Sequence, residues 1–321
     1  MYKLLVVGKI PPPIGGASIH VERMIHHLER DDFDFIFYDL YDFNFFSLVR
    51  LIKKTDIVHC HSNNRIFLFI TVLVAIVFRK KSVLTIHGNV GSRGIVMSFF
   101  EKQAIKFVGC PIVLNQESFN KVSALNKNLK KLSSFIFPIK STPLVADLKL
   151  KLKDFITEGM VNCCINASGL FFDKNEQEIY GVLTLLEYFK HDTTKNLIIS
   201  DPSGMYAKHI EKENLKTDNV FIIDHPHDFY EILKISDCFI RPTTTDGDSL
   251  SIKEAITLNK IVIASDCVER PKGVLLYNAK DELFDLLSNP KKWSTNYDKI
   301  ENGYDLIIAE YNMLMKGGNV D

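Results

Sequence analysis

The sequence predicts an α/β protein made of two doubly wound parallel sheets, and three observations support this prediction. The chain has 321 residues, enough for about two domains of ordinary size. Its 46% hydrophobic and 24% charged residues indicate a globular protein rather than a disordered or fibrous one. Short apolar runs alternate with segments of helical periodicity, and such alternation is typical of a parallel sheet covered by helices on both faces.

The first half of the chain contains five short apolar runs that predict strands. They cover residues 3–7, 33–38, 57–60, 83–86 and 112–114. Helical periodicity between them predicts helices at 18–29, 64–78, 95–107 and 116–126. From about 137 to 159 the pattern loosens around two prolines, Pro138 and Pro143. We therefore expect a linker there and a first domain at 1–150.

The same alternation restarts in the second half, which we expect to form a second domain at 151–321. Strands are expected at 161–165, 196–199, 220–223, 237–240 and 261–264, and helices at 175–189, 204–213, 227–235 and 249–259. A last helix at about 298–316 could pack back on the first domain. Ligands of open α/β sheets bind beyond the carboxyl ends of the strands. We therefore expect the two Rossmann-like domains to face each other across a cleft.

Charge is divided unevenly between the two halves, although the net charge is zero. Residues 1–150 carry 20 basic and 11 acidic side chains, whereas the rest carries 19 and 28. A basic first half favours contact with an anionic lipid surface or a phosphorylated acceptor. The alternative is that opposite charges help the halves dock. Nucleic acid is not expected as a partner, because the basic residues do not interleave with an aromatic RNA-binding motif.

Cysteine usage and hydropathy indicate a cytoplasmic protein. The six cysteines show no C-x-x-C spacing and mostly lie in apolar runs, so we expect core residues in a reducing compartment and no zinc site. The chain does not open with a secretory signal pattern. The longest apolar run, 66–78, has 13 residues, too few to span a bilayer as a helix. Basic residues near this run could touch the inner membrane face: Lys53, Lys54, Arg79, Lys80 and Lys81.

The first candidate site motif is the loop that follows the first predicted strand. It runs from Gly8 through three prolines to Gly15, Gly16 and Ser18, where a helix is expected to begin. Adjacent glycines allow a ligand close to the backbone, and a helix N-terminus favours anions. The loop matches neither G-x-G-x-x-G nor the phosphate-binding P-loop. It could also be only a rigid turn.

The second motif follows the strand expected at 237–240. Asp246 lies on a loop and Glu254 eight residues later on a helix, so both can face one ligand. The backbone N–H groups of Ser249 and Leu250 would begin that helix and favour an anion. Two alternatives stay open. Ser251-x-x-Glu254 also matches a capping box, and Asp246-Gly247-Asp248 could clamp a metal ion on a nucleotide diphosphate.

The two motifs together resemble the retaining glycosyltransferases of family four, which have the GT-B fold. The resemblance spans nearly the whole chain. It begins at the Gly15-Gly16 loop and includes two acids separated by seven residues, Asp246 and Glu254, and the run Ile261-Val262-Ile263-Ala264-Ser265-Asp266. The string through Glu269-Arg270-Pro271-Lys272-Gly273 looks like the branch that builds bacterial surface polysaccharides. The resemblance implies a transferase that takes a sugar from a nucleotide-sugar donor.

The resemblance also implies roles for individual residues. Glu254 would hold the donor ribose, and Asp246 would contact the hydroxyl groups of the donor sugar. The diphosphate would lie beside Gly15 and Gly16, with the amides near Ser249 and Leu250 on the phosphates. His87, in Thr85-Ile86-His87-Gly88, matches the active-site histidine of the family. The alternative is that His87 is a loop histidine with no role in the reaction. His59 and His61 could touch the acceptor or only pack at a strand end.

Two departures from the family pattern affect these roles. The family usually has Glu where Asp246 stands, one methylene longer. The family also places an Arg and a Lys after the first strand of the second domain, where this chain has only Lys174. Arg241, Arg270 or Lys272 could substitute in holding the leaving diphosphate, which needs positive charge or amide dipoles.

The implied mechanism is front-face attack, with the leaving phosphate accepting the proton of the acceptor. Neither a cofactor nor a metal is expected, because the helix dipole and basic residues would hold the diphosphate. The acceptor would be a glycan or a sugar on a polyprenyl diphosphate. The alternatives are a sugar-nucleotide epimerase or hydrolase of the same fold, and a GT-B protein that binds nucleotide sugar without transferring it.

Overall fold

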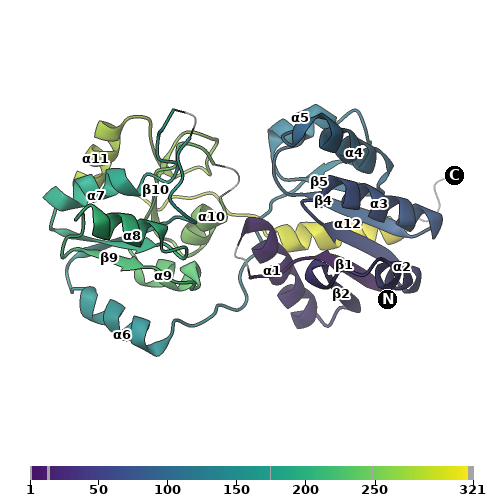
Figure 1. Cartoon of the computed structure of the whole chain (residues 1–321), viewed down its shortest axis with the longest axis horizontal. Helices are drawn as coiled ribbons and strands as arrows, with labels where there is room; N and C mark the ends of the chain where they lie inside the picture. The colour runs from purple at the N-terminus through teal and green to yellow at the C-terminus, as the bar shows by residue number, and fades with distance from the viewer. Residues whose placement is uncertain (1, 13–14, 174, 247–248, 317–321) are drawn as a thin grey trace. The chain divides into compact units, whose positions relative to one another are not determined.

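A computed structural model describes residues 2–12, 15–173, 175–246 and 249–316 (Figure 1). The chain divides into two compact units, Met1–Lys140 with Glu301–Asp321, and Ser141–Ile300. Each unit contains a six-stranded sheet in which every described pairing of strands is parallel. Helices alternate with the strands along the chain. The predicted fold class, two doubly wound Rossmann-like domains, is confirmed.

The sheet of the first unit has the strand order β2-β1-β3-β4-β5-β6. Its strands are β1 (Leu4–Gly8), β2 (Phe35–Asp39), β3 (Ile57–His61), β4 (Lys81–Ile86), β5 (Cys110–Val113) and β6 (Lys130–Lys131). Its helices are α1 (Gly16–Arg30), α2 (Phe45–Lys54), α3 (Arg65–Val77), α4 (Gly94–Phe107), α5 (Gln116–Val122) and α12 (Gly303–Lys316), with a 3₁₀ turn at Leu40–Asp42.

Both faces of this first sheet are covered, as the apolar composition of β1 requires. Leu4 and Val6 point to the side where α1 and α12 pack. Leu5 and Val7 point to the other side, against residues of α2, α3 and α4. Since successive side chains of a strand point to opposite faces, a strand buried on both faces must be apolar throughout. The core of this unit therefore has two layers, one on each side of β1.

The second unit repeats this construction with the strand order β12-β11-β10-β7-β8-β9. Its strands are β7 (Val161–Asn166), β8 (Lys195–Ser200), β9 (Val220–Ile223), β10 (Cys238–Arg241), β11 (Ile261–Ser265) and β12 (Leu275–Tyr277). Its helices are α6 (Ala146–Phe155), α7 (Val182–His191), α8 (Met205–Lys212), α9 (Phe229–Ile235), α10 (Leu250–Thr257) and α11 (Lys280–Ser288), with a 3₁₀ turn at Pro290–Lys292. Cys163 and Cys164 pack into the cores on opposite faces of β7.

The boundary between the units lies after Lys140, earlier than the boundary expected after residue 150. The reason is α6, which forms inside the segment expected to be a linker. Leu148 and Leu152 of this helix are buried in a core of the second unit. The last helix, α12, belongs to the first unit, where Tyr304, Ile307 and Tyr311 are buried with residues of α1 and β1.

The helix expected at 175–189 begins later, at Val182. Gly181 precedes it with a φ of +71°, and a Cβ at this position would lie 2.5 Å from the carbonyl oxygen of Pro242. Glu178 then caps the helix from outside, because its carboxylate accepts hydrogen bonds from the N–H groups of Val182 and Leu183 at 2.7 and 2.9 Å. Close approach of β10 and α7 therefore fixes where the helix begins.

Two further expectations concern the cysteines, expected in the core, and the apolar run 66–78, expected to be too short to span a bilayer. Five of the six cysteines are buried and Cys267 is exposed, and all six are free thiols. No helix within the described ranges is long and apolar enough to cross a membrane. The apolar run at 66–78 forms most of α3, which packs along α4 and against its own sheet.

Candidate functional site

The glycine loop of the first unit leads directly from β1 into α1. Gly15 is the N-cap residue and Gly16 the first residue of the helix. Both are exposed. Among the described residues, a Cβ at Gly16 would meet nothing within 4 Å, and one at Gly15 would meet only the Ser18 hydroxyl at 3.8 Å. The space beside the start of α1 is therefore open to another molecule.

A pocket of about 460 Å³ lies in the first unit at the carboxyl ends of its strands. Lys9 after β1, Phe43 before α2 and Asn64 before α3 line it. Ser18 and Val21 contribute from α1, and His61 and His87 line it where β3 and β4 end. This position is the one that ligands of open α/β sheets occupy. The lining combines one ammonium group, neutral hydrogen-bonding groups and aromatic rings.

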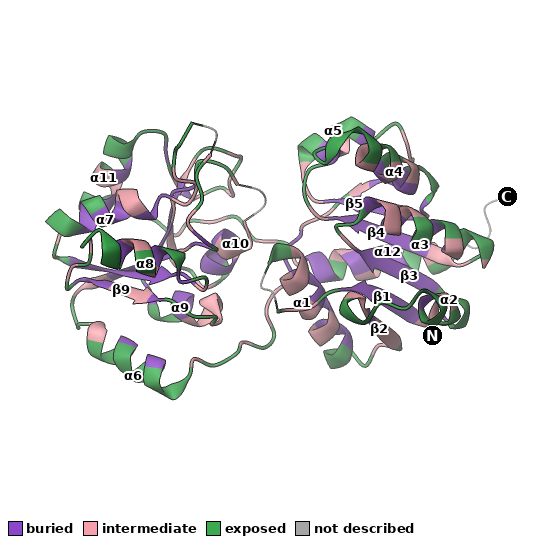
Figure 2. Ribbon diagram, in the orientation of Figure 1, coloured by how far each residue is buried: buried purple, intermediate pink, exposed green. Residues whose placement is uncertain are grey.

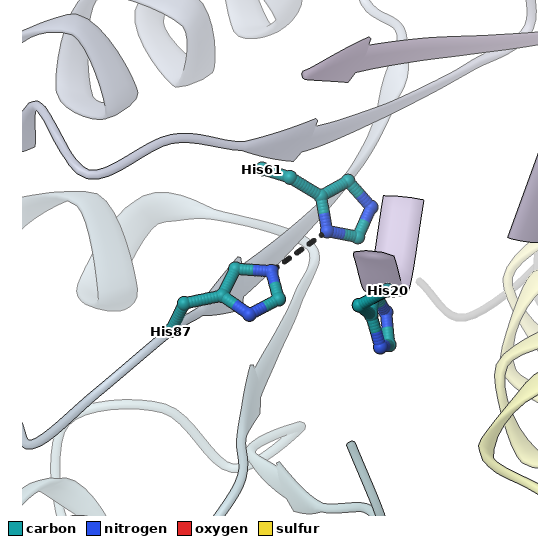
Figure 3. A group of neighbouring side chains, drawn as sticks. All are labelled: His20, His61 and His87. Atoms are coloured by element: carbon teal, nitrogen blue, oxygen red, sulfur yellow. Dashed lines mark hydrogen bonds between the residues drawn. The ribbon is translucent and has the colours of Figure 1, made fainter. Parts of the chain in front are cut away.

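His61 and His87, which line the pocket, lie close to a third histidine, His20 of α1 (Figure 3). His61 Nδ1 lies 3.1 Å from His87 Nε2, so one of these atoms donates to the other. The ring of His20, on α1, lies 5.4 Å from that of His61 and 5.2 Å from that of His87. Nδ1 of His20 faces the carbonyl oxygen of Ser134 at 2.7 Å. Since a carbonyl only accepts, His20 carries its proton on Nδ1 and leaves Nε2 as an acceptor.

The histidine cluster is uncharged at neutral pH. Burial lowers the pKa of His20 to about 4 and holds the pKa values of His61 and His87 well below their ordinary value. Nε2 of His20 and of His61 are buried without a hydrogen-bond partner. The cluster thus offers acceptor atoms rather than positive charge beside the pocket.

A buried ion pair supports the loop that carries His87. Arg65, at the start of α3, pairs with Glu101 of α4, with Nε 2.8 Å from a carboxylate oxygen. The Arg65 guanidinium also donates to the carbonyl oxygens of Ser62 and His87, at 3.3 and 3.5 Å. Glu101 accepts the N–H of Gly91 at 2.8 Å. These contacts connect the ends of β3 and β4 and position His61 relative to His87.

Within the described parts of the chain, His20, His61 and His87 form one group whose side chains could hold a metal ion. Their ligand atoms lie within 4.8 Å of one another. Nitrogens about 2.0–2.1 Å from a tetrahedral zinc ion would lie about 3.4 Å apart. One His61 nitrogen and one His87 nitrogen are engaged with each other. The arrangement is that of a hydrogen-bonded cluster, and ion binding would require the three rings to converge.

The acidic motif of the second unit lies at the carboxyl ends of β10 and β11, with Asp246 between two arginines. Arg241 donates from Nε and Nη2 to the two carboxylate oxygens of Asp246, at 3.1 and 3.0 Å. Arg270 donates from Nη1 at 2.8 Å. Burial alone would raise the pKa of Asp246, but the hydrogen bonds and charges of both arginines lower it. Together, these three side chains carry one net positive charge.

The arginines are also tied to the strand ends around them. Arg241 donates from Nη1 to the backbone and side-chain oxygens of Asn166, at 3.3 and 3.2 Å. Arg270 donates from Nε to the carbonyl oxygen of Ser265 at 3.1 Å. Asn166 ends β7 and Ser265 ends β11. The cluster therefore connects three neighbouring strands of the second sheet at their carboxyl ends.

Helix α10 begins beside this cluster, and its N-cap is Ser249. The Ser249 hydroxyl accepts from the N–H of Ile252 at 3.4 Å, which makes Ile252 the third helical residue. Glu254 lies two residues further on and is 5% exposed. The capping-box interpretation of Ser251-x-x-Glu254 is therefore wrong. Ser251 instead accepts from the side-chain amide of Asn166 at 2.9 Å, which connects α10 to the end of β7.

The two lysines predicted to hold the diphosphate, Lys272 and Lys174, are not seen among the described residues of the Asp246 cluster. Lys272 is exposed, with its ammonium group 3.8 Å from a carboxylate oxygen of Asp298. Lys174 lies outside the described residues, as do Gly247 and Asp248 of the possible metal clamp. Asp246, Arg241 and Arg270 are thus the predicted site residues that the structure brings into direct contact in the second unit.

Sequence reasoning missed part of the first-unit cluster. His20 and the Arg65–Glu101 pair carried no recognisable motif, because their partners come from elements far away in the sequence. A signal for His20 was available. It is the fifth residue of a helix that starts at the glycine loop, so its side chain lies near the ligand-facing end of that helix.

Comparison with solved structures shows which fold these two units form. The structure of HepE (Alr3699) from Anabaena, solved with UDP and glucose, covers 98% of this chain and 97% of its own, with 14% identity and a TM-score of 0.65. The fold is GT-B. The GT-B structure of the lipopolysaccharide outer core galactosyltransferase WaaB covers 89% of both chains, with 13% identity and a TM-score of 0.56. A putative UDP-N-acetylglucosamine 2-epimerase from Listeria monocytogenes covers 99% and 98%, with 12% identity and a TM-score of 0.61.

These likenesses concern the GT-B fold alone, because the identities are low. No protein-family model matches the chain. No curated protein matches it in sequence. Transferases and an epimerase share the GT-B fold, so the function has to be argued from the site.

Proposed function

We propose that the protein is a glycosyltransferase that takes a sugar from a nucleotide-sugar donor. The observation that carries this proposal is the arrangement in the second unit, where the Asp246 cluster with its net positive charge lies at the sheet edge beside the start of α10. A diphosphate needs positive charge and N–H donors. A buried carboxylate, Glu254, follows within the same helix and is suited to accept the hydroxyl groups of a ribose.

Asp246 has a positioning role in this proposal. Its two oxygens accept three hydrogen bonds from guanidinium groups, so it orients Arg241 and Arg270 toward the strand ends. Contact with the sugar hydroxyls, as the family resemblance implies, would use the remaining lone pairs of the carboxylate. The arginines supply the field for the diphosphate together with the amides of Ser249 and Leu250, which replaces the basic pair that the family usually has elsewhere.

The reaction proceeds by front-face attack with retention of the anomeric configuration. The bond between the anomeric carbon and the donor diphosphate oxygen breaks, and a bond from that carbon to the acceptor oxygen forms. The acceptor proton passes to the leaving diphosphate. The family resemblance assigns His87 to the transferred sugar, and its neutral imidazole can accept or donate a hydrogen bond. No metal is needed for this chemistry, since the arginines and the helix N-terminus stabilise the leaving group.

The acceptor is a glycan or a polyprenyl-diphosphate-linked sugar at the inner face of the bacterial plasma membrane, in the synthesis of surface polysaccharide. Three considerations support this assignment. Residues 269–273 resemble the branch of the family that builds bacterial surface polysaccharides. The fold is similar to that of a galactosyltransferase of the lipopolysaccharide outer core, and the first half of the chain is basic. Lys9 at the pocket of the first unit is suited to meet a phosphate of the acceptor.

A donor screen tests the proposal. The protein is incubated with a pool of nucleotide sugars, with and without a polyprenyl-diphosphate sugar, and the products are followed by mass spectrometry. We expect one donor to be consumed in the presence of the acceptor, with a matching mass gain on the acceptor. Isomerisation or hydrolysis of a donor without any acceptor would establish the epimerase or hydrolase alternative. Binding without turnover would establish a non-catalytic nucleotide-sugar protein.

A further inference from the structure

The helices on one side of the first sheet expose an unusual number of large apolar side chains. α3 lies between α2 and α4. The exposed apolar residues of these helices are Phe45 and Phe46 of α2, Ile70, Leu73, Ile76 and Val77 of α3, and Ile95, Val96, Phe99 and Phe107 of α4. Ile95 is 91% exposed, Phe46 79% and Val77 72%. Single exposed apolar residues are ordinary in soluble proteins, but this set gathers on three adjacent helices.

These three helices form one continuous layer. α3 packs along α4 and also contacts α2 (Figures 1 and 2). Phe69 of α3 and Phe100 of α4 lie with their rings 5.8 Å apart. On the other side, the Lys53 ammonium group of α2 lies 4.6 Å from the ring of Phe78, at the end of α3. We call the outer side of α2, α3 and α4 the apolar face.

The charges around the apolar face are almost all positive. Residues 45–107 contain ten basic and two acidic side chains, and setting aside the buried Arg65–Glu101 pair leaves nine basic and one acidic. Asp56, one of the two acids, accepts the backbone N–H of Lys3, and Glu101, the other, is buried against Arg65. Exposed basic groups lie where each helix ends or on its outer side, at Lys53 and Lys54 of α2, Arg79 after α3, and Lys102 and Lys106 of α4.

We propose that the apolar face is a docking surface for an anionic membrane, with its apolar side chains in the acyl boundary and its basic groups among the lipid head groups. Apolar residues flanked by Lys and Arg are the features by which helices lie in a membrane interface. The charge balance indicates the occupant, because nine basic side chains against one acidic one, without the buried Arg65–Glu101 pair, favour anionic lipid over a neutral partner.

The pocket of the first unit opens beside this surface. Phe43, which precedes α2, and Phe67, in the first turn of α3, both line it, and their rings lie 5.5 Å apart. A molecule anchored in the lipid next to the first turn of α3 would thus be close to His61 and His87. This link to a lipid-linked acceptor rests on the proposed function, whereas docking itself does not.

Vesicle co-sedimentation of the full chain tests the proposal, with vesicles of phosphatidylcholine alone and of phosphatidylcholine with phosphatidylglycerol. We expect binding to the anionic vesicles to be stronger by about tenfold or more and to weaken with salt. The triple variant Val77→Ser, Ile95→Ser, Phe99→Ser should bind about tenfold or more weakly. Replacing Lys53, Lys54, Arg79, Lys80 and Lys81 together by Gln should remove the preference for anionic lipid.

The matched control is Leu150→Ser, Phe172→Ser, Leu276→Ser, which removes three exposed apolar side chains of the second unit and should bind vesicles like the wild type. All replaced apolar positions are exposed, so every variant should keep the wild-type circular dichroism spectrum. Equal binding of the wild type to both vesicles, or unchanged binding of the first triple variant, would overturn the proposal and favour a protein partner on this face.

Turnover separates this inference from the proposed function. On a short water-soluble acceptor, the apolar triple variant should transfer sugar at the wild-type rate, because none of its positions lines the pocket or the Asp246 cluster. On an acceptor embedded in anionic vesicles, the same variant should be about tenfold or more slower. Transfer without any vesicle dependence would reject docking alone, and vesicle binding without use of any nucleotide sugar would reject the proposed function alone.

Discussion

Acidification should lower the free energy of unfolding of the first unit, and the protonation of His20 should account for a defined share of this decrease. The pKa of His20 is lowered by burial to about 4, whereas an unfolded histidine titrates near pH 6.5. Between these values the unfolded chain binds a proton that the folded chain does not. Stability that is fully present above about pH 6.5 is therefore lost as the pH falls toward 4. The difference of about 2.5 pKa units corresponds to about 3 kcal/mol.

The variant His20→Asn isolates this contribution. The Asn amide can donate to the Ser134 carbonyl in place of Nδ1–H, but it does not titrate. The groups around it, His61, His87 and Arg23, remain in both proteins, so their own titration largely cancels in the comparison. The variant should lose about 3 kcal/mol less free energy of unfolding than the wild type between pH 7 and pH 4.

Urea unfolding at the two pH values, followed by circular dichroism and by hydrogen exchange of peptides from α1, measures this difference. His26→Asn, on the same helix but outside the cluster, is the control and should follow the wild type. Equal losses for the wild type and His20→Asn would refute the reasoning, since they would show that the imidazole of His20 is protonated freely in the folded protein.

Three further predictions concern the candidate site. Glu254→Gln should weaken donor binding by about 1.5–3 kcal/mol in calorimetric titration with a donor while the melting temperature stays near that of the wild type; the reverse pattern would make Glu254 a structural residue. Transfer should survive EDTA, and full loss that Mn²⁺ or Mg²⁺ restores would support a metal clamp at Asp246. Gly16→Ala should leave the melting temperature unchanged or higher, because its Cβ meets nothing within 4 Å and Ala favours a helix, yet it should raise KM for the donor. An unchanged KM would remove the glycine loop from the binding site.

The sequence predicted the sheets well because both are buried on both faces. Each of the ten expected strands overlaps an observed one, since a strand such as β1, packed on two sides, must be apolar throughout. The short edge strands β6 and β12 were not predicted, because two or three residues give no periodicity. α6 was missed because its Lys-rich sequence buries only Leu148 and Leu152.

The candidate site was predicted only where its residues are neighbours in the chain. Asp246, Glu254 and the N-terminus of α10 come from one segment, so spacing was enough to indicate them. The bidentate contact of Arg241 with Asp246 could not be predicted, because spacing does not fix side-chain rotamers. The meeting of His20 with His61 and His87 depends on strand order β2-β1-β3-β4, which brings α1 beside the ends of β3 and β4.

The return of α12 to the first unit has a consequence for biosynthesis. Gly303 lies against the segment that follows β6, where a Cβ would clash with the carbonyl oxygen of Ser133. Tyr304, Ile307 and Tyr311 then complete the core on one side of β1. A ribosome makes these residues only after the whole of 141–300. The second unit is one contiguous segment whose core does not depend on them, whereas the core of the first unit stays incomplete until they have been made. N-terminal domains usually fold first during synthesis, but here the first unit cannot complete its core before the whole of the second unit has been synthesised.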